Sequence, residues 1–393
     1  MHDSHLDRLE CPRCHATRPA VVRQQLCACG GPLFARYRLA DVAAVVRTDD
    51  LARRTPDLWR YRELLPVQDP AFARSLGEGF TPLLASRRLG AELGLPGVWF
   101  KDESGNPTGS FKARGLSVAI ARAAELGART VVLPTAGNAG GALACYAALH
   151  GLRARVYLPA SASRVFRDEA VAFGAEVVQV DGSIAACARR LASEMAPDWF
   201  DISTLKEPYR LEGKKTMGFE LWEQLGTLPD AILYPTGGGT GLIGMWKAFA
   251  ELAELGWNTG KRPRMIAVQS AGCAPVVDAF RAGRDTVEPC ASAVTAAEGL
   301  RVPRPLADRE ILAAIRESGG TAIAVAEERI ATGVLRLART EGILTSPEGG
   351  ALVAALEDLT AAGDLRPGAS VVLFLTGSAY KYPSFLETLD RPL

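Results

Sequence analysis

The chain has 393 residues, which is enough for two or three domains. Apolar residues make up 48% and charged residues 23% of the sequence, which excludes a collagen-like or wholly disordered chain. The 45 Lys and Arg residues balance 44 Asp and Glu residues, so the basic excess of a general nucleic-acid binder is absent. No apolar run approaches the roughly 20 residues that span a bilayer, and the polar start lacks a signal-peptide core. We expect a cytoplasmic protein with no nucleic-acid or membrane partner.

Four of the eight cysteines lie in two close pairs near the N-terminus. The pairs are Cys11 with Cys14, and Cys27 with Cys29. Four thiolates can hold Zn²⁺ tetrahedrally, although the second pair has one intervening residue where two to four are usual. His15 is an alternative ligand, and a knuckle that keeps its geometry without metal is the other interpretation. We expect residues 1–36 to form a separate cysteine-rich ribbon.

From Val98 onward, short apolar runs alternate with stretches of helical periodicity. Such alternation is typical of parallel sheets that are covered by helices, so we predict an α/β fold. A helix is predicted over 138–150, ending before Gly151. The predicted strands are 129–134, 153–158, 176–180, 231–234, 265–268 and 371–375.

The segment 101–115 reads Lys-Asp-Glu-Ser-Gly-Asn-Pro-Thr-Gly-Ser-Phe-Lys-Ala-Arg-Gly. Helical periodicity begins just after Lys112, which places this lysine where a loop passes into a helix. The positive end of a helix dipole and partial burial both lower the pKa of an amine, and such an amine suits Schiff-base chemistry. Taken alone, Lys112 also fits a solvated residue at the start of a helix.

Three other segments follow predicted strands and offer groups that bind small ligands. Gly137 allows close approach of the backbone, and Asn138 is both donor and acceptor, although it also suits a helix N-cap. A glycine-rich turn exposes backbone N–H groups before a helix, as a phosphate site requires. It is neither a dinucleotide fingerprint nor a P-loop. Its residues are Gly237, Gly238, Gly239, Thr240 and Gly241. Thr376 offers a hydroxyl at the end of the last strand, where ligands of open α/β sheets bind, or else simply terminates the strand.

Taken in this order, the four segments resemble the fold-type-II pyridoxal-phosphate (PLP) enzymes, which include the threonine synthases and the threonine and serine dehydratases. The resemblance runs from residues 79–83, Gly-Phe-Thr-Pro-Leu, to the C-terminus. It implies two open α/β domains with PLP in the cleft between them. It also implies that Lys112 binds PLP as a Schiff base and that Asn138 hydrogen-bonds its phenolic oxygen. By the same resemblance, 237–241 bind the cofactor phosphate and Thr376 faces the pyridine nitrogen.

The string at 207–216, Glu-Pro-Tyr-Arg-Leu-Glu-Gly-Lys-Lys-Thr, is similar to one in threonine synthases that dehydratases lack. The cysteine-rich start also resembles a subgroup of threonine synthases. This resemblance implies that Arg210, Ser203 and Thr204 face a substrate phosphate, which a guanidinium binds through two parallel hydrogen bonds. A surface ion pair of Arg210 with Glu207 or Glu212 is the alternative. The implied reaction is that of a lyase in threonine biosynthesis, in which O-phospho-L-homoserine and water give L-threonine and phosphate.

Three positions differ from the threonine synthase pattern, in which Asp, Thr and His are common. They are Ala113, Ala139 and Ser378. Because these sites flank the reacting carbons, a threonine or serine dehydratase or a β-replacement enzyme on a serine-type substrate is the alternative function. A non-enzymatic binding module is a third, against which the intact cofactor residues argue.

The family also implies a division of the chain and an oligomeric state. We expect a smaller α/β domain over 116–214 and a larger PLP-binding domain that combines 60–115 with 215–393. Family precedent indicates a homodimer.

Overall fold

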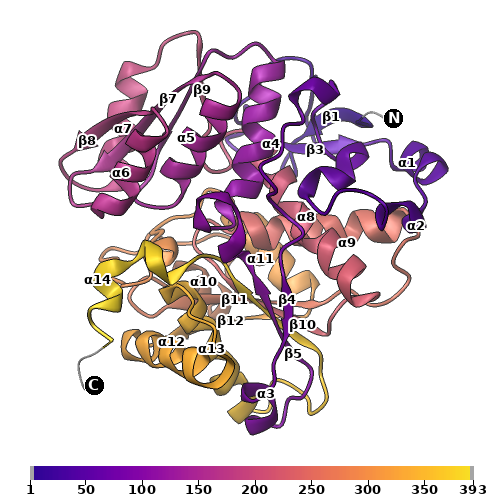
Figure 1. The fold of residues 1–393 in the computed structure, drawn as a ribbon, viewed down its shortest axis with the longest axis vertical. Coiled ribbons are helices and arrows are strands. Elements are labelled where there is room, and N and C mark those ends of the chain that lie inside the picture. The colour runs from indigo at the N-terminus through magenta and orange to yellow at the C-terminus, as the bar shows by residue number, and fades with distance from the viewer. Residues whose placement is uncertain (1–3, 390–393) are drawn as a thin grey trace. The chain divides into compact units, whose positions relative to one another are not determined.

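The computed structural model describes residues 4–389, which contain three β-sheets (Figure 1). Contacts between Cα atoms divide the chain into two compact units. Unit 1 comprises Met1–Phe80, Asn106–Met217 and Ala250–Trp257, and unit 2 comprises Thr81–Gly105, Gly218–Phe249 and Asn258–Leu393. No helix within residues 4–389 is long and apolar enough to cross a membrane. The domain boundaries expected from the sequence stay a prediction.

Unit 1 begins with a small antiparallel sheet in the strand order β2-β1-β3. Helical turns follow it, and Leu58 and Trp59 pack with Val118 and Ala121 of α4 (Lys112–Glu125) in a buried apolar cluster. The elements of this part are β1 (Leu6–Glu10), β2 (Thr17–Arg18), β3 (Phe34–Tyr37), α1 (Leu39–Val45), α2 (Thr48–Leu51), and the 3₁₀ helices η1 (Leu58–Leu64) and η2 (Pro70–Phe72). The part of the chain predicted to form a cysteine-rich ribbon therefore contains a three-stranded sheet, and the residues that follow this sheet pack on α4.

The rest of unit 1 is built around a parallel sheet in the order β8-β7-β6-β9. Its elements are η4 (Pro107–Gly109), α4 (Lys112–Glu125), β6 (Thr130–Pro134), α5 (Ala139–Leu149), β7 (Arg153–Pro159), α6 (Arg164–Ala172), β8 (Glu176–Val180), α7 (Ile184–Glu194), β9 (Trp199–Asp201) and the first part of α8 (Tyr209–Leu225), whose residues from Gly218 on belong to unit 2. Cys187 and Leu191 of α7 pack on Val132 and Tyr157 at one face of the sheet. The three strands predicted here are confirmed, and β9 was not predicted.

Unit 2 contains a six-stranded sheet in the order β12-β11-β10-β13-β5-β4, in which only the β4–β5 pair is antiparallel. Its elements are β4 (Leu83–Ala85), α3 (Leu89–Glu92), β5 (Val98–Asp102), η3 (Glu103–Gly105), β10 (Ala231–Pro235), α9 (Thr240–Glu254), β11 (Arg264–Ser270), α10 (Pro275–Arg281), η5 (Glu298–Leu300), α11 (Asp308–Glu317), β12 (Thr321–Val325), α12 (Glu327–Glu341), α13 (Pro347–Ala361), β13 (Val371–Leu375), η6 (Ala379–Lys381) and α14 (Pro383–Leu386). Helix α13 is apolar on nearly every side because it is buried between this sheet and α12.

Polar pairing occurs inside the unit 2 core as well. Lys101 on β5 and Glu220 on α8 are both fully buried, with 2.8 Å between Nζ and a carboxylate oxygen. The ammonium also donates to the carbonyl of Thr81 at 2.7 Å and to the side chain of Gln224 at 2.9 Å. The buried charge is thus satisfied by three acceptors, as burial of an ion requires.

Candidate active site

Lys112 is the first residue of α4, so the predicted position at a loop-to-helix junction is present. The loop before it turns sharply, because Thr108 and Gly109 both adopt positive φ, 62° and 66°. The half-buried Lys112 side chain places Nζ 4.4 Å from the centre of the Phe111 ring. Nζ of Lys214 lies 3.9 Å from the same ring centre and donates to the carbonyl of Phe111. Lys214 was missed in the sequence, where it is one lysine of a Lys-Lys pair.

Helix α4 approaches the start of α8 very closely, and two glycines make this possible. A Cβ atom on Gly115 would lie 2.8 Å from the carbonyl oxygen of Arg210. A Cβ atom on Gly213 would lie 2.0 Å from the carbonyl oxygen of Arg114. The helix that begins with Lys112 is therefore held against the helical turn that contains Arg210.

Asn138 and Ser203 follow neighbouring parallel strands, β6 and β9, so their loops leave the same edge of the unit 1 sheet. Asn138 directly precedes α5, but its side chain does not cap this helix in the described part of the chain. Asn138 therefore occupies the expected N-cap position without a capping hydrogen bond from its side chain. The Ser203 amide donates to Oδ1 of Asp201 at 2.9 Å, and the Ser203 hydroxyl donates to the same oxygen. Thr204 is exposed.

Arg210 is buried, with 3% of its surface exposed. Its Nη1 donates to the carbonyl of Ile202 at 2.8 Å, while Nε has no hydrogen-bond partner among residues 4–389. Glu207 accepts from the backbone amide of Arg210 at 3.1 Å, and no described carboxylate lies within 4.0 Å of the guanidinium. The alternative of a surface ion pair is therefore wrong. Burial lowers the pKa of Arg210, although the negative charges of Glu207 and Asp201 act to raise it.

The glycine-rich turn of unit 2 connects β10 to α9, as predicted. The Thr236 amide donates to Val268 and the Ile243 amide to Gly239. Between them, the amides of residues 237–242 make no hydrogen bond to any described residue. The first N–H groups of a helix have no carbonyl of the same helix four residues before them. Side chains are excluded at several of these positions; a Cβ atom on Gly237 would lie 2.3 Å from the carbonyl oxygen of Gly299. The turn is thus a row of unused donors at a helix N-terminus.

Thr376 follows β13, which is hydrogen-bonded to β10, so Thr376 and the glycine-rich turn lie at the same edge of the unit 2 sheet. Thr376 is 5% exposed. The Ser346 amide donates to the carbonyl of the adjacent Gly377 at 3.1 Å, and the fully buried Ser346 hydroxyl has no partner among residues 4–389. Ser346 was missed because its signal, a serine before a helix-starting proline, is that of an ordinary N-cap.

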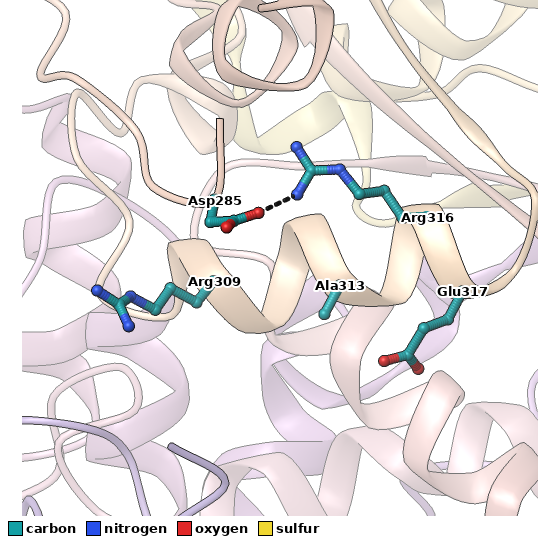
Figure 2. Close-up of a pocket in the computed structure, with 5 residues that line it drawn as sticks. All are labelled: Asp285, Arg309, Ala313, Arg316 and Glu317. Atoms are coloured by element: carbon teal, nitrogen blue, oxygen red, sulfur yellow. Dashed lines mark hydrogen bonds and ion pairs between the residues drawn. The ribbon is translucent and has the colours of Figure 1, made fainter. Parts of the chain in front are cut away.

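The structure therefore gathers the predicted residues in two sets. Lys112, Asn138, Ser203 and Arg210 belong to unit 1, and the glycine-rich turn with Thr376 belongs to unit 2. A surface pocket on α11 contains none of them (Figure 2). Its lining residues are Asp285, Arg309, Ala313, Arg316 and Glu317, of which Asp285 and Arg316 form an ion pair at 2.8 Å.

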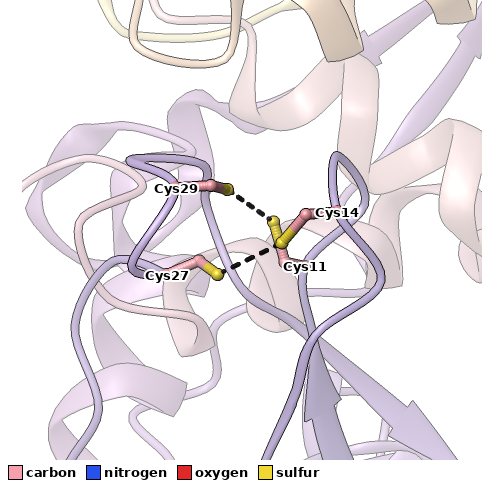
Figure 3. A group of neighbouring side chains, drawn as sticks. All are labelled: Cys11, Cys14, Cys27 and Cys29. Carbon is pink, nitrogen blue, oxygen red and sulfur yellow. Dashed lines mark hydrogen bonds between the residues drawn. The ribbon is translucent and has the colours of Figure 1, made fainter.

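The four N-terminal cysteines converge on one point in unit 1 (Figure 3). Their Sγ atoms all lie within 4.8 Å of one another, with 3.5 Å between Cys11 and Cys29 and between Cys14 and Cys27. The chain turns back after each pair, with hydrogen bonds from the His15 amide to Cys11 and from the Gly30 amide to Cys27. The His15 side chain is 80% exposed and is not one of the four side chains of the cluster.

Comparisons with known proteins show the family to which the chain belongs. Residues 74–377 match the family described as pyridoxal-phosphate dependent enzyme. The chain is 34% identical to the threonine synthase of Methanocaldococcus jannaschii, over 98% of this chain and 95% of that protein. It is 35% identical to the threonine synthase of Methanosarcina acetivorans, with the same coverage. The chain belongs to the threonine synthase family of PLP-dependent enzymes. The expected enzyme class, PLP as cofactor and the threonine synthase function are thereby confirmed.

The fold comparison adds the architecture expected for a threonine synthase. Maize serine racemase matches with a TM-score of 0.67 and 23% sequence identity, covering 79% of this chain and 91% of that one. At this identity the likeness concerns the fold alone. The expected fold-type-II α/β class is confirmed.

Proposed function

We propose that this threonine synthase converts O-phospho-L-homoserine and water into L-threonine and inorganic phosphate. The observation that carries this substrate is the buried guanidinium of Arg210, which has no carboxylate in ion-pair contact and an Nε atom with no partner among residues 4–389. A buried charge without a counter-ion is costly. A phosphate dianion supplies the missing charge and accepts two parallel hydrogen bonds from a guanidinium. The Ser203 hydroxyl, held by Asp201, is the second proposed contact.

The residues present fit PLP as the cofactor. The unused amides of residues 237–242 suit its phosphate, and the buried hydroxyls of Thr376 and Ser346 suit its ring nitrogen. Lys112 offers the amine for covalent attachment and Asn138 a hydrogen bond to the phenolic oxygen. When bound, PLP supplies an electron sink, and a neutral hydroxyl beside its nitrogen makes that sink milder than an aspartate would.

Lys112 also has the proposed role of moving protons. Its Nζ would remove the proton at Cα and one at Cβ, and would return one proton to Cγ and one to Cα. Arg210 would hold the phosphate as it leaves from Cγ. Water would give its hydroxyl to Cβ and its remaining proton to the departing phosphate. General acid–base catalysis requires a group that reaches these carbons, which the flexible lysine stem allows.

The test is phosphate release by the purified protein, with O-phospho-L-homoserine and O-phospho-L-serine compared under the same conditions. Equal amounts of phosphate and threonine from the homoserine ester alone support the proposal. Release of phosphate from the serine ester instead favours the β-replacement alternative. Bound PLP, seen by its visible absorbance, together with no phosphate from the homoserine ester would contradict the proposal.

We also propose that the four N-terminal cysteines bind Zn²⁺. Tetrahedral ligation with Zn–S bonds of about 2.3 Å requires sulfur–sulfur distances of about 3.8 Å, and the cluster provides 3.5 Å for two pairs and at most 4.8 Å for all. Elemental analysis of protein purified without chelator should give one zinc per chain. Two disulfides and no metal, seen by mass spectrometry, would exclude this assignment.

A further inference from the structure

The segment 20–25, which lies between the two cysteine pairs, contacts the rest of unit 1 through its backbone and side chains. The carbonyl oxygen of Ala20 accepts a hydrogen bond from Nη2 of Arg122 at 2.7 Å and from the hydroxyl of Tyr209 at 3.4 Å. Arg122 lies on α4, which begins with Lys112, and Tyr209 precedes Arg210. The segment therefore contacts both helices that carry proposed active-site residues.

The same segment contacts the end of β9. Nε2 of Gln25 donates to the carbonyl of Asp201 at 3.0 Å, and Nη1 of Arg23 donates to the carbonyl of Asp198 at 3.2 Å. The Asp201 carboxylate in turn accepts hydrogen bonds from the amide and hydroxyl of Ser203. Asp201 is therefore bonded to Gln25 through its main-chain carbonyl and to Ser203 through its carboxylate.

We propose that the segment 20–25, held in place by the metal-bound cysteines, positions the substrate-phosphate site through Asp201 and Ser203. This inference rests on the proposed function. Gln25 is a positioning residue, since it touches neither substrate nor PLP but the backbone of the residue that orients Ser203. The cysteine cluster acts one step further away, because Cys27 lies two residues after Gln25 and its turn ends the segment.

The segment depends on such anchors because it has little else to hold it. It contains no helix or strand, and the side chains of Val21 and Val22 are exposed at 67% and 49%. Its order therefore comes from the cysteine turn that follows it, at Cys27, and from the hydrogen bonds described above. If the cysteine cluster releases the turn at Cys27, the segment loses this constraint, and its hydrogen bonds to the rest of unit 1 become weaker.

The decisive comparison is between Gln25→Ala and Gln24→Ala. Gln24 is the matched control, because among residues 4–389 its side-chain amide donates only to the carbonyl of nearby Pro19, at 3.3 Å, and not to β9. A hydrogen bond of this kind is worth about 3- to 10-fold in an equilibrium constant, so Gln25→Ala should raise KM for O-phospho-L-homoserine by about that factor. Its kcat and its PLP absorbance should change less than about twofold, and Gln24→Ala should leave KM unchanged. Equal KM values in the two variants would overturn the proposal.

The role of the metal is tested with Cys29→Ser, which removes an exposed proposed zinc ligand. We expect it to lose zinc, keep PLP absorbance and raise KM at least as far as Gln25→Ala does. A folded, zinc-free Cys29→Ser protein with wild-type KM would overturn the role of the metal. Should this variant fail to fold, the Gln25 comparison still decides the positioning role.

A separate readout distinguishes this proposal from the proposed function. Amide hydrogen exchange of the peptide that contains Ser203 should accelerate in Gln25→Ala and not in Gln24→Ala, whatever substrate the enzyme uses. If the wild-type protein does not turn over O-phospho-L-homoserine, the proposed function fails while the exchange result still tests the contact. Unchanged exchange in Gln25→Ala would overturn the positioning role directly.

Discussion

Gly213 of α8 lies directly against the backbone of Arg114 in α4, and there is no room for a side chain between them. A Cβ atom on Gly213 would come within 2.0 Å of the Arg114 carbonyl oxygen. This contact fixes the separation of two helices, one beginning with Lys112 and the other carrying Arg210 in its first turn. The glycine in the Leu-Glu-Gly part of the 207–216 string is thus required by packing.

Gly213→Ala should therefore destabilise the protein although alanine favours helices. Overpacking of this kind costs about 1–3 kcal/mol, because one helix must shift. Chemical denaturation measures the loss, and a lower kcat is expected as well, since Lys112 moves with α4. Gly260→Ala is the control, since its nearest neighbour would be at an ordinary 3.6 Å. An unchanged unfolding midpoint for Gly213→Ala would show that the helices can separate freely.

Lys112→Ala should abolish both covalent cofactor attachment and proton transfer. Loss of a positioned acid–base group alone costs about 10²–10⁴-fold in turnover, and loss of the covalent step adds to it. The visible absorbance of lysine-bound PLP should disappear while the unfolding midpoint stays close to that of the wild type. Lys261→Ala, which changes an exposed lysine, should retain activity. Turnover within tenfold of wild type in Lys112→Ala would exclude Lys112 from the chemistry.

Arg210→Met should weaken binding of the phosphorylated substrate. Hydrogen bonds to charged groups are worth about 1.5–3 kcal/mol, which corresponds to about 10- to 150-fold in kcat/KM. The kcat/KM of Arg210→Lys should lie between that of the wild type and that of Arg210→Met. An ammonium keeps the charge but cannot donate two parallel hydrogen bonds. Addition of inorganic phosphate should inhibit the wild-type enzyme more strongly than Arg210→Met. The same inhibition constant in both proteins would contradict the assignment.

Glu207 should make stability depend on pH. Burial raises the pKa of its carboxyl from 4.5 to about 7, although Arg210 and the backbone amides of Tyr209 and Arg210 oppose this shift. The folded state therefore holds the proton more tightly than the unfolded state, and stability is lost as pH rises from about 4.5 to about 7. Glu207→Gln should remove up to about 3 kcal/mol of this fall, measured by urea unfolding across that range. Parallel pH profiles for the two proteins would refute the assignment.

The regular elements of the parallel sheets were largely predictable. Strands β8 and β13 match the predicted 176–180 and 371–375 because runs of β-branched and apolar residues define them on both sides. The helix over 138–150 was recognisable from its small apolar residues and from Gly151, whose φ is 66°. Strand β9 spans only Trp199–Asp201, which is too short for a periodic pattern.

The site was predictable only as far as local pattern reaches. The placement of Lys112 at a helix start depends on neighbouring residues, and it was predicted. The burial of Arg210 depends on residues far away in the sequence, so the alternative of a surface ion pair with Glu207 could not be dismissed beforehand. The Gln25–Asp201 contact joins residues 176 positions apart and has no local signal. The homodimer, the cytoplasmic location and the domain boundaries stay predictions.

The position of β13 has a consequence for how the chain is made. Although β13 is the last of the six strands in chain order, it lies between β5 and β10 and is hydrogen-bonded to both. Until residues 371–375 have emerged from the ribosome, β5 and β10 each present an open edge, the kind of surface that pairs with other chains. The six-stranded sheet therefore closes only after residues 371–375 have been made, and a nascent chain released before that point is left with two aggregation-prone strand edges.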